Sequence, residues 1–387
     1  MRVVLAMPYS NSPLWGVQNV AYNLVQGFTR LYKELERNDI EITVLSNVGR
    51  TLKPQEVFSQ CPQLRIVSYR QLPPITFLGD IHQTLLAKKY FHATLSSADI
   101  VHSHDVTFSL PIAKMFKDKP ILHTCHGLFW NEKEYLNSLY QRFSYNTMTI
   151  RSKLLARLKN VKFVAISNYV AEEIKRELRI LDDRVHISHN PLSEDFFNIE
   201  KREIPGLIFY PVRLIPRKNH LPLIEALGIL KRKGPSHFTL ALAGGVEDRE
   251  YFNKIIQLVK KYGLENNVTF LGKLSKKEIL EYYSRASIVI LTSHEETFSL
   301  TVAEAMATGT PVVASPVGIV PEIVTDWKTG FNINSNDPED IADKIAILLD
   351  DDNLRKKMGD NAKIVANDFK SENIAQSLIS LWKKVIY

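Results

Sequence analysis

Short runs of β-branched and other apolar residues alternate with longer segments of helical periodicity along the first half of the chain. Runs of this length are typical of strands that are buried on both faces, and the segments between them predict covering helices. We predict strands at Arg2–Ala6, Ile40–Leu45, Leu64–Val67, Asp99–His102, Pro120–Thr124, Val161–Ile166 and Val185–Ile187. We predict helices at Gln18–Leu31, Phe77–Ser96, Glu132–Leu158 and Tyr169–Leu178. This alternation indicates a parallel, doubly wound α/β sheet.

The same alternation restarts after residues 190–206, a connection with two prolines, mixed charge and little periodicity. We predict strands at Leu207–Tyr210, Phe238–Ala243, Asn267–Leu271, Ser287–Leu291, Pro311–Ala314 and Gly330–Ile333. We predict helices at Asn219–Lys233, Arg249–Tyr262, Ser275–Arg285, Ser299–Thr308, Glu339–Leu349, Asn353–Asn367 and Ser371–Ile386. A length of 387 residues fits two such domains of similar size.

Composition places the chain among ordinary globular proteins, because 45% of its residues are hydrophobic and 24% are charged. The formal charge of +7 favours an anionic partner, which leaves nucleic acid, an acidic membrane surface and phosphorylated ligands open. The two cysteines, Cys61 and Cys125, have no metal-ligand spacing around them, and their scarcity fits a reducing compartment. The start of the chain reads as a strand rather than a signal peptide, and no run is long enough to span a bilayer. We therefore expect a cytoplasmic protein.

A predicted strand ends near Thr292, and a helix is predicted to begin near Ser299 after a short polar loop. The first N–H groups of a helix have no internal partner and its dipole end is positive, so this junction can hold a phosphate. Glu296 precedes the helix and Glu304 lies inside it among apolar residues, where a carboxylate suits sugar hydroxyls better than phosphate. The alternative is structural, with Glu296 in a capping arrangement and Glu304 facing water.

Arg213 and Lys218 surround a turn at Pro216, directly after the first predicted strand of the second half. Arginine can hold two phosphate oxygens at once and lysine supplies a point charge. A solvated basic loop is the alternative. We expect phosphate binding because the carboxyl end of a parallel strand places both cations beside the helix start described above.

Two further candidate features lie in the first half of the chain, each shortly after a predicted strand. The loop Pro8–Val17 contains Gly16, which permits a close backbone approach to a ligand, but it lacks the glycine pattern of a dinucleotide site. His126 and Gly127 follow a predicted strand, and we expect His126 to contact a ligand. The remaining histidines of this zone, which we expect to be structural, are His102, His104 and His123. No carboxylate or cysteine stands at a supporting spacing, so no metal site is expected.

Together these motifs resemble the retaining GT-B glycosyltransferases of glycosyltransferase family 4, over essentially the whole chain. The most specific match is Glu-x7-Glu from Glu296 to Glu304, followed by the segment Ala305–Ala314 with its Gly-x-Pro-Val-Val-Ala end. Arg213 and Lys218 match the family's Arg-x4-Lys element. The resemblance implies two facing Rossmann-like domains with a deep interdomain cleft and a C-terminal helix that crosses back to the N-terminal domain. Residues 1–190 with 371–387 would bind the acceptor, and residues 191–370 would bind the nucleotide sugar.

The resemblance also implies a role for each matched residue. Glu304 would hold the ribose, Glu296 the hydroxyls of the donor sugar, Arg213 and Lys218 the diphosphate, and His126 the transferred sugar near its reacting carbon. The other implied donor-binding positions are Gly16, Gly244, Gly272, Lys273, Leu274, Phe298, Ser299, Leu300 and Thr301. The donor would be a UDP- or GDP-sugar, with retained anomeric configuration and with neither a cofactor nor a metal.

The chain departs from the family pattern at some of these positions. Thr297 and Ser299 stand where the family often has glycine, and we expect Ser299 to cap the following helix instead. Trp15 and Gly16 stand where a pair of glycines is usual. These departures leave the donor sugar and the acceptor open.

Several functions therefore remain. The first is transfer to a glycan, a lipid or a lipid-linked acceptor in cell-surface glycan biosynthesis. The second is transfer to a small metabolite, and the third is a catalytically silent nucleotide-sugar-binding subunit, against which the retained motif residues argue. Nucleic acid is not expected, because no aromatic-basic motif supports it. The basic and apolar stretch Arg142–Lys162 would suit an anionic membrane surface at the inner face, or a helix that packs on its own sheet and shows its cations to water.

Overall fold

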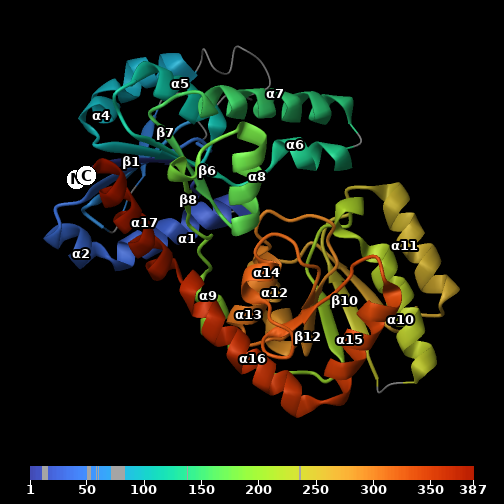
Figure 1. The fold of residues 1–387 in the computed structure, drawn as a ribbon. Helices are drawn as coiled ribbons and strands as arrows, with labels where there is room; N and C mark the ends of the chain where they lie inside the picture. Colours follow the sequence, from blue (N-terminus) through green and yellow to red (C-terminus); the bar gives the residue numbers. More distant parts are fainter. Residues whose placement is uncertain are drawn as a thin grey trace. The chain divides into compact units, whose positions relative to one another are not determined.

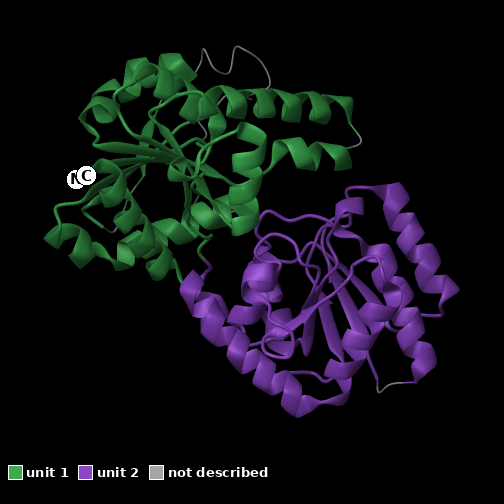
Figure 2. Ribbon diagram, viewed as in Figure 1, with its two compact units in different colours: residues 1–191, 370–387 green, residues 192–369 purple. Residues whose placement is uncertain are grey.

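Every predicted strand is present in the computed structural model, with both ends within one residue of the prediction (Figure 1). The structure describes residues 1–10, 16–49, 54–57, 59, 61–70, 83–136, 138–234 and 237–387. Trp15 and the start of the predicted helix Phe77–Ser96 lie outside these residues. The chain forms two compact units, residues 1–191 with 370–387 and residues 192–369 (Figure 2), a division one residue away from the sequence-based boundaries.

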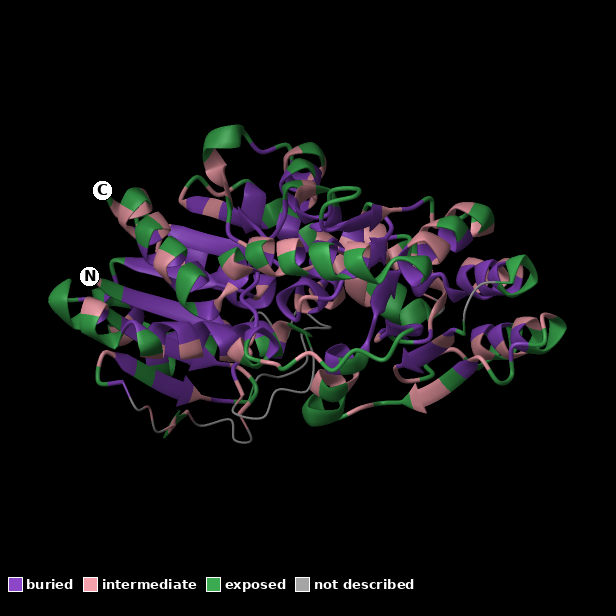
Figure 3. Ribbon diagram, turned by 90° about the horizontal axis from the view of Figure 1, so that it is seen from below, coloured by how far each residue is buried: buried purple, intermediate pink, exposed green. Residues whose placement is uncertain are grey.

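Unit 1 is built on an eight-stranded sheet in the order β3-β4-β2-β1-β5-β6-β7-β8. Its strands are β1 Arg2–Met7, β2 Glu41–Ser46, β3 Gln55–Val57, β4 Leu64–Ser68, β5 Ile100–Ser103, β6 Ile121–Cys125, β7 Val161–Ala165 and β8 Val185–Ile187. All neighbours pair in parallel except the short edge strand β3, which runs antiparallel to β4 and was not predicted. The central strands are buried along nearly their whole length, as strands covered on both faces should be (Figure 3).

The helices of unit 1 cover both faces of this sheet. They are α1 Gly16–Arg30, α2 Tyr32–Arg37, η1 Ala87–Phe91, α4 His92–Ser97, α5 Val106–Met115, α6 Phe129–Glu132, η2 Lys133–Tyr135, α7 Leu139–Ala156, α8 Asn168–Leu178, η3 Asp182–Arg184 and α17 Ser371–Ile386. Helix α5 was not predicted. It is buried on almost every side and contains Pro111, so it lacks the one-sided apolar pattern that reveals a surface helix.

The single predicted helix Glu132–Leu158 was wrong. The structure has α6 and η2, then an extended backbone at Leu136, and a new helix from Leu139. The Arg142 side chain donates to the Leu136 carbonyl, which satisfies the chain where the first helix stops. The apolar periodicity continues across this break, so the sequence pattern did not predict where the helix is interrupted.

The last helix, α17, packs on α1 inside unit 1, as the resemblance implied. Trp382 stacks on Phe28 with ring centroids 5.4 Å apart, and its indole N–H donates to His102. A Cβ on Gly27 would meet the Ser371 carbonyl oxygen at 2.2 Å, so the two helices can approach this closely only because residue 27 is glycine.

Unit 2 is built on a six-stranded parallel sheet in the order β11-β10-β9-β12-β13-β14. Its strands are β9 Leu207–Tyr210, β10 Thr239–Ala243, β11 Val268–Gly272, β12 Ile288–Leu291, β13 Val312–Ala314 and β14 Gly330–Asn332. Its helices are α9 Glu194–Phe197, η4 Pro216–Lys218, α10 His220–Lys233, α11 Arg249–Lys261, α12 Lys276–Arg285, α13 Leu300–Ala307, α14 Val320–Ile323, α15 Pro338–Asp350, α16 Asp352–Ala366 and η5 Asn367–Phe369. Among the residues that the structure describes, no helix could cross a membrane.

The strand order reverses once in each sheet, between β1 and β5 in unit 1 and between β9 and β12 in unit 2. Ligands of doubly wound sheets bind beyond the carboxyl ends of the strands at such a point. In unit 2 this position is occupied by the segments after β9 and β12, and in unit 1 by those after β1 and β5. The fold therefore brings Arg213, Lys218 and Glu296 to this position in unit 2. In unit 1 it brings His104 there, with His126 after the neighbouring strand β6.

Candidate functional site

Lys218 and Glu296 form a buried ion pair at the switch point of unit 2. Lys218 ends the short helix η4 after β9, and Glu296 lies in the loop after β12. Ser293 also donates to the same Glu296 oxygen over 2.8 Å. Burial disfavours ionisation of Glu296, but the charges of Lys218 and Arg217 outweigh it and hold the pKa of this carboxyl below its ordinary value. The loop therefore presents a fixed carboxylate and ammonium side by side.

Two arginines add positive charge around this pair. Arg213 is half exposed and its guanidinium lies 3.0 Å from Glu247, which the sequence did not single out. Arg217 lies 3.4 Å from the Glu295 carbonyl oxygen, and its charge acts on both Lys218 and Glu296. Three cations therefore gather within one segment after β9. Arg217 was also missed, although it stands between Pro216 and Lys218.

Helix α13 begins directly after this loop, and its first-turn N–H groups have no intrahelical acceptor. Ser299 occupies the N-cap position, but the expected cap is wrong, because its side chain makes no capping hydrogen bond. Its backbone instead has φ +80°, the left-handed region that favours glycine. The Ser299 hydroxyl is buried and has no hydrogen-bond partner among the described residues. The chain thus keeps the backbone of a glycine at this position while carrying a serine.

Glu304 lies on α13, and its carboxylate accepts a hydrogen bond from the Tyr283 hydroxyl of α12 over 3.1 Å. Burial raises the pKa of Glu304 to about 7, although the hydrogen bond from Tyr283 opposes the shift. The carboxyl therefore changes charge near neutral pH. Tyr283 lies 21 positions away along the chain, and no pattern in the sequence pointed to it as the partner.

The other donor-binding positions suggested by the resemblance contribute mostly backbone shape. The amide of Gly244 donates to the Gly272 carbonyl, and Gly272 has φ +66° at the end of β11. The Phe298 ring packs edge-on against Phe369 in the core, so only its backbone faces the loop. The Thr301 hydroxyl donates to the Pro211 carbonyl. The remaining positions lie at the surface or half-buried: exposed Lys273, and half-buried Leu274 and Leu300.

The switch point of unit 1 carries histidines in place of charges. His126 follows β6, and its Nε2 lies 2.8 Å from Nδ1 of His104, which follows β5. The two rings stack with centroids 5.0 Å apart. Burial lowers the pKa of His126 to about 4 and lowers that of His104 as well, so both rings are neutral at physiological pH. Gly16 is the exposed first residue of α1.

Two further histidines have structural partners. His102 accepts from the Trp382 indole at one ring nitrogen and lies 2.7 Å from the Thr124 hydroxyl at the other. His123 bonds the Ser109 hydroxyl over 2.9 Å. These contacts agree with the structural role expected for both. In the described part of the chain, no group of three or more His, Cys, Asp or Glu residues is arranged to hold a metal ion.

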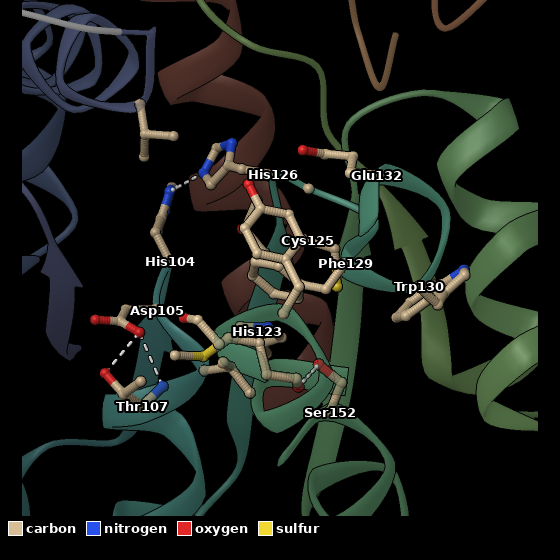
Figure 4. Close-up of a pocket in the computed structure, with 17 residues that line it drawn as sticks. His104, Asp105, Thr107, His123, Cys125, His126, Phe129, Trp130, Glu132 and Ser152 are labelled. Carbon is tan, nitrogen blue, oxygen red and sulfur yellow. Dashed lines mark hydrogen bonds between the residues drawn. The ribbon is translucent and has the colours of Figure 1, made fainter. Parts of the chain in front are cut away.

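A cavity of about 410 Å³ opens beside the histidine pair (Figure 4). Figure 4 shows His104 and His126 joined by their hydrogen bond, with Asp105 bonded to Thr107 below them. Its aromatic and apolar wall consists of Val17, Phe129, Trp130, Tyr145 and Met148. The Trp130 indole nitrogen is buried and has no hydrogen-bond partner within the described residues. Asp105 caps α5, so this helix start is already satisfied by a carboxylate.

Comparisons with known proteins agree with this architecture. The family model for glycosyl transferases group 1 matches residues 193–365, and that for glycosyltransferase family 4 matches residues 16–196. The D-inositol 3-phosphate glycosyltransferase of Corynebacterium efficiens is 26% identical over 386 residues, which cover 91% of this chain and 88% of the relative.

Solved structures show the same fold at low sequence identity. Sucrose-phosphate synthase of Thermosynechococcus elongatus superposes with a TM-score of 0.73 at 19% identity, covering 99% of this chain and 98% of that one. Anabaena HepE, in complex with UDP and glucose, gives a TM-score of 0.72 at 18% identity, covering 99% and 100%. The two family models together extend from residue 16 to residue 365, and the neighbours share both Rossmann-like sheets. The chain therefore belongs to the GT-B glycosyltransferases of glycosyltransferase family 4.

Proposed function

We propose that this glycosyltransferase takes its sugar from a nucleotide-diphosphate sugar bound at the switch point of unit 2. The observation that carries the proposal is the buried Lys218–Glu296 pair, because it sets an ammonium beside a carboxylate at the start of α13. Lys218 has three donors, so it can keep Glu296 and also bind a phosphate oxygen. Arg213 and the first amides of α13 add charge and donors for the diphosphate. HepE, a structural neighbour, was solved with UDP and glucose, which supports a UDP-sugar.

Each carboxylate then has a separate task. Glu296 accepts hydrogen bonds from hydroxyls of the donor sugar. Glu304, once it is ionised, accepts hydrogen bonds from the ribose hydroxyls. In the reaction, the bond from the anomeric carbon to the phosphate oxygen breaks and a bond to the acceptor oxygen forms on the same face. Because both events occur on one face, the anomeric configuration is retained, and the acceptor proton passes to the departing phosphate. Lys218, Arg213 and the α13 amides stabilise the charge of the leaving diphosphate, a task that a metal ion performs elsewhere.

We further propose that unit 1 binds the acceptor and that His126 contacts the transferred sugar. The aromatic wall of the cavity suits the apolar faces of sugar rings, and its neutral histidines suit hydroxyls. We propose a glycan, a lipid or a lipid-linked glycan as acceptor, in cell-surface glycan biosynthesis at the cytoplasmic side of a membrane.

A small-metabolite acceptor is the second candidate, because D-inositol 3-phosphate glycosyltransferases match most of the chain. An inositol 3-phosphate acceptor carries a phosphate. Among the described residues, no lysine or arginine lines the cavity, and Asp105 and Glu132 do. Their negative charge disfavours a phosphorylated acceptor there.

A donor screen tests the proposal. The protein is titrated with UDP-glucose, UDP-N-acetylglucosamine and GDP-mannose, and its melting temperature and slow sugar hydrolysis are followed. One donor should raise the melting temperature, since a ligand that binds only the folded state adds stability. Lys218→Ala should reduce that rise. No shift and no hydrolysis with any donor would overturn the proposal. A shift without any turnover would instead indicate a catalytically silent subunit that binds nucleotide sugars.

A further inference from the structure

Helix α7 carries an exposed apolar stripe that no packing within the fold explains. Leu139 is 84% exposed, Phe143 61% and Ile150 58%, and Leu154 and Tyr140 extend the same surface at 37% and 57%. Spacings of four, seven and four place positions 139, 143, 150 and 154 on one side of the helix. Large apolar side chains of this kind are usually buried, so several of them on one side of a helix mark a contact surface.

The structure separates this stripe from the face that packs on unit 1. Met148, Ser152, Leu155 and Ala156 are buried, and α7 lies against α5 and α6 (Figure 1). Helix α7 therefore already has a full packing face. The exposed residues lie on its other side, so they are not needed to hold α7 in place.

The charges around the stripe have one sign. Arg142, Lys153 and Arg157 are exposed along it, and the sequence Leu139–Ala156 contains no Asp or Glu. The exposed acid nearest in sequence is Glu134, which lies before the helix. An apolar stripe with a cationic border matches the interface of a bilayer that contains anionic lipids.

A second copy of the chain fits this surface less well. A symmetric dimer would place the same patch of both copies together, so the three cations would meet their equivalents. Like charges in contact oppose association, whereas anionic headgroups neutralise them. We propose that the α7 stripe docks the protein peripherally on an anionic membrane, with Leu139, Phe143, Ile150 and Leu154 entering the headgroup region. This adds a membrane surface to the proposed function and is tested without measuring transfer.

Vesicle co-sedimentation provides the test. The full chain is mixed with vesicles of phosphatidylcholine alone or of phosphatidylcholine with phosphatidylglycerol, at low and at physiological salt. We expect binding to the anionic vesicles only, weakened by salt. Phe143→Ser with Ile150→Ser should lower the partition coefficient at least about tenfold, because both side chains leave the lipid phase. Lys153→Gln with Arg157→Gln should lower it by a similar factor on anionic vesicles.

The matched control removes equally exposed apolar residues elsewhere. Leu181→Ser with Ile364→Ser should leave vesicle binding unchanged, since these side chains are 74% and 68% exposed outside α7. All variants should keep the wild-type melting temperature and nucleotide-sugar binding, which separates loss of docking from loss of folding or of the proposed function. The proposal is overturned if the wild type stays in solution, or if the control variant loses as much binding. It is also overturned if the wild type elutes as a dimer that Phe143→Ser with Ile150→Ser converts to a monomer.

Discussion

The two switch points of this protein share one topology and differ in their charge. In unit 2 the position holds Lys218 and Glu296 in an ion pair, with Arg213 and Arg217 nearby. In unit 1 it holds His104 and His126 as a neutral hydrogen-bonded pair beside an aromatic cavity. The same strand order therefore supports a site suited to a diphosphate and a site suited to hydroxyls and sugar rings. The difference lies in the side chains of the loops, since the strand order reverses in the same way in both sheets.

Breaking the charged pair should have the largest effect. Lys218→Ala leaves the Glu296 carboxylate buried without its cation, so we expect a loss of about 3 kcal/mol or more in the free energy of unfolding, measured with urea. Turnover should fall at least about a hundredfold. Arg213→Ala removes a half-exposed ion pair and should cost under about 1 kcal/mol of stability.

The double variant Lys218→Ala with Glu296→Ala is the control, and it should recover part of the lost stability, because no isolated charge remains. If Lys218→Ala and Arg213→Ala destabilised the protein equally, the buried pair would contribute no more to the stability of unit 2 than the half-exposed pair does.

The pH dependence of Glu304 sharpens the comparison further. Its folded pKa is raised to about 7 from 4.5, so the folded state binds more protons between these values. Stability should therefore fall as pH rises through this window, by up to about 3 kcal/mol, and Glu304→Gln should remove the slope. Nucleotide-sugar affinity should change in the opposite direction, rising with pH up to about 7, because we propose that ionised Glu304 accepts hydrogen bonds from the ribose hydroxyls. Calorimetric titrations at several pH values measure both effects, and a donor affinity independent of pH would contradict the ribose role.

The histidines of unit 1 should respond to pH with the opposite sign. Burial lowers the pKa of His126 to about 4 and that of His123 to about 3, below the ordinary 6.5. The unfolded chain binds more protons between these values, so stability is full above about 6.5 and is lost as pH falls toward 4. At pH 5 the free energy of unfolding should be lower by about 2 kcal/mol for each of these histidines than it is above pH 6.5. Hydrogen exchange should show β5 and β6 losing protection on acidification before α13, and the reverse order would refute the assignment.

The smallest effect concerns the backbone of Ser299. Its φ of +80° favours glycine, and its hydroxyl is buried without a partner in the described structure. Ser299→Gly should therefore raise the free energy of unfolding by about 1 kcal/mol, with donor affinity unchanged within about twofold. Ser299→Ala keeps the strain and serves as the matched control. A stability gain with alanine but none with glycine would show that the lost hydroxyl, and not the backbone, was responsible.

The fold of unit 2 could be predicted almost completely from the sequence. Its strands are short apolar runs, and local residue types mark its helix boundaries. A capping box at Ser275 begins α12, and the left-handed Gly234 ends α10. Unit 1 was harder, because α5 is buried all round and because the break before α7 interrupts a continuous apolar pattern. Local patterns reveal a helix only where one face differs from the other.

Only part of the candidate site could be predicted from the sequence. Glu296, Lys218 and Glu304 stand out by residue type and spacing. Their partners do not. Tyr283 reaches Glu304 only through the fold, and the local contact from Ser293 to Glu296 follows no motif. Ser299 shows the other limit, since its residue type predicts a cap and its backbone adopts a glycine conformation.

The most direct test measures UDP binding by calorimetry, with EDTA present throughout, for the wild type, for a unit 2 variant and for a unit 1 variant. We expect the wild type to bind UDP without metal and far more tightly than uridine, because in the proposed site the cations of unit 2 hold the diphosphate. Lys218→Ala should weaken UDP at least about tenfold and leave uridine unchanged, whereas His126→Ala should leave UDP unchanged. A wild type that fails to bind UDP in EDTA, or UDP binding that survives Lys218→Ala intact, would contradict the assignment of the diphosphate site to Lys218 and its neighbours.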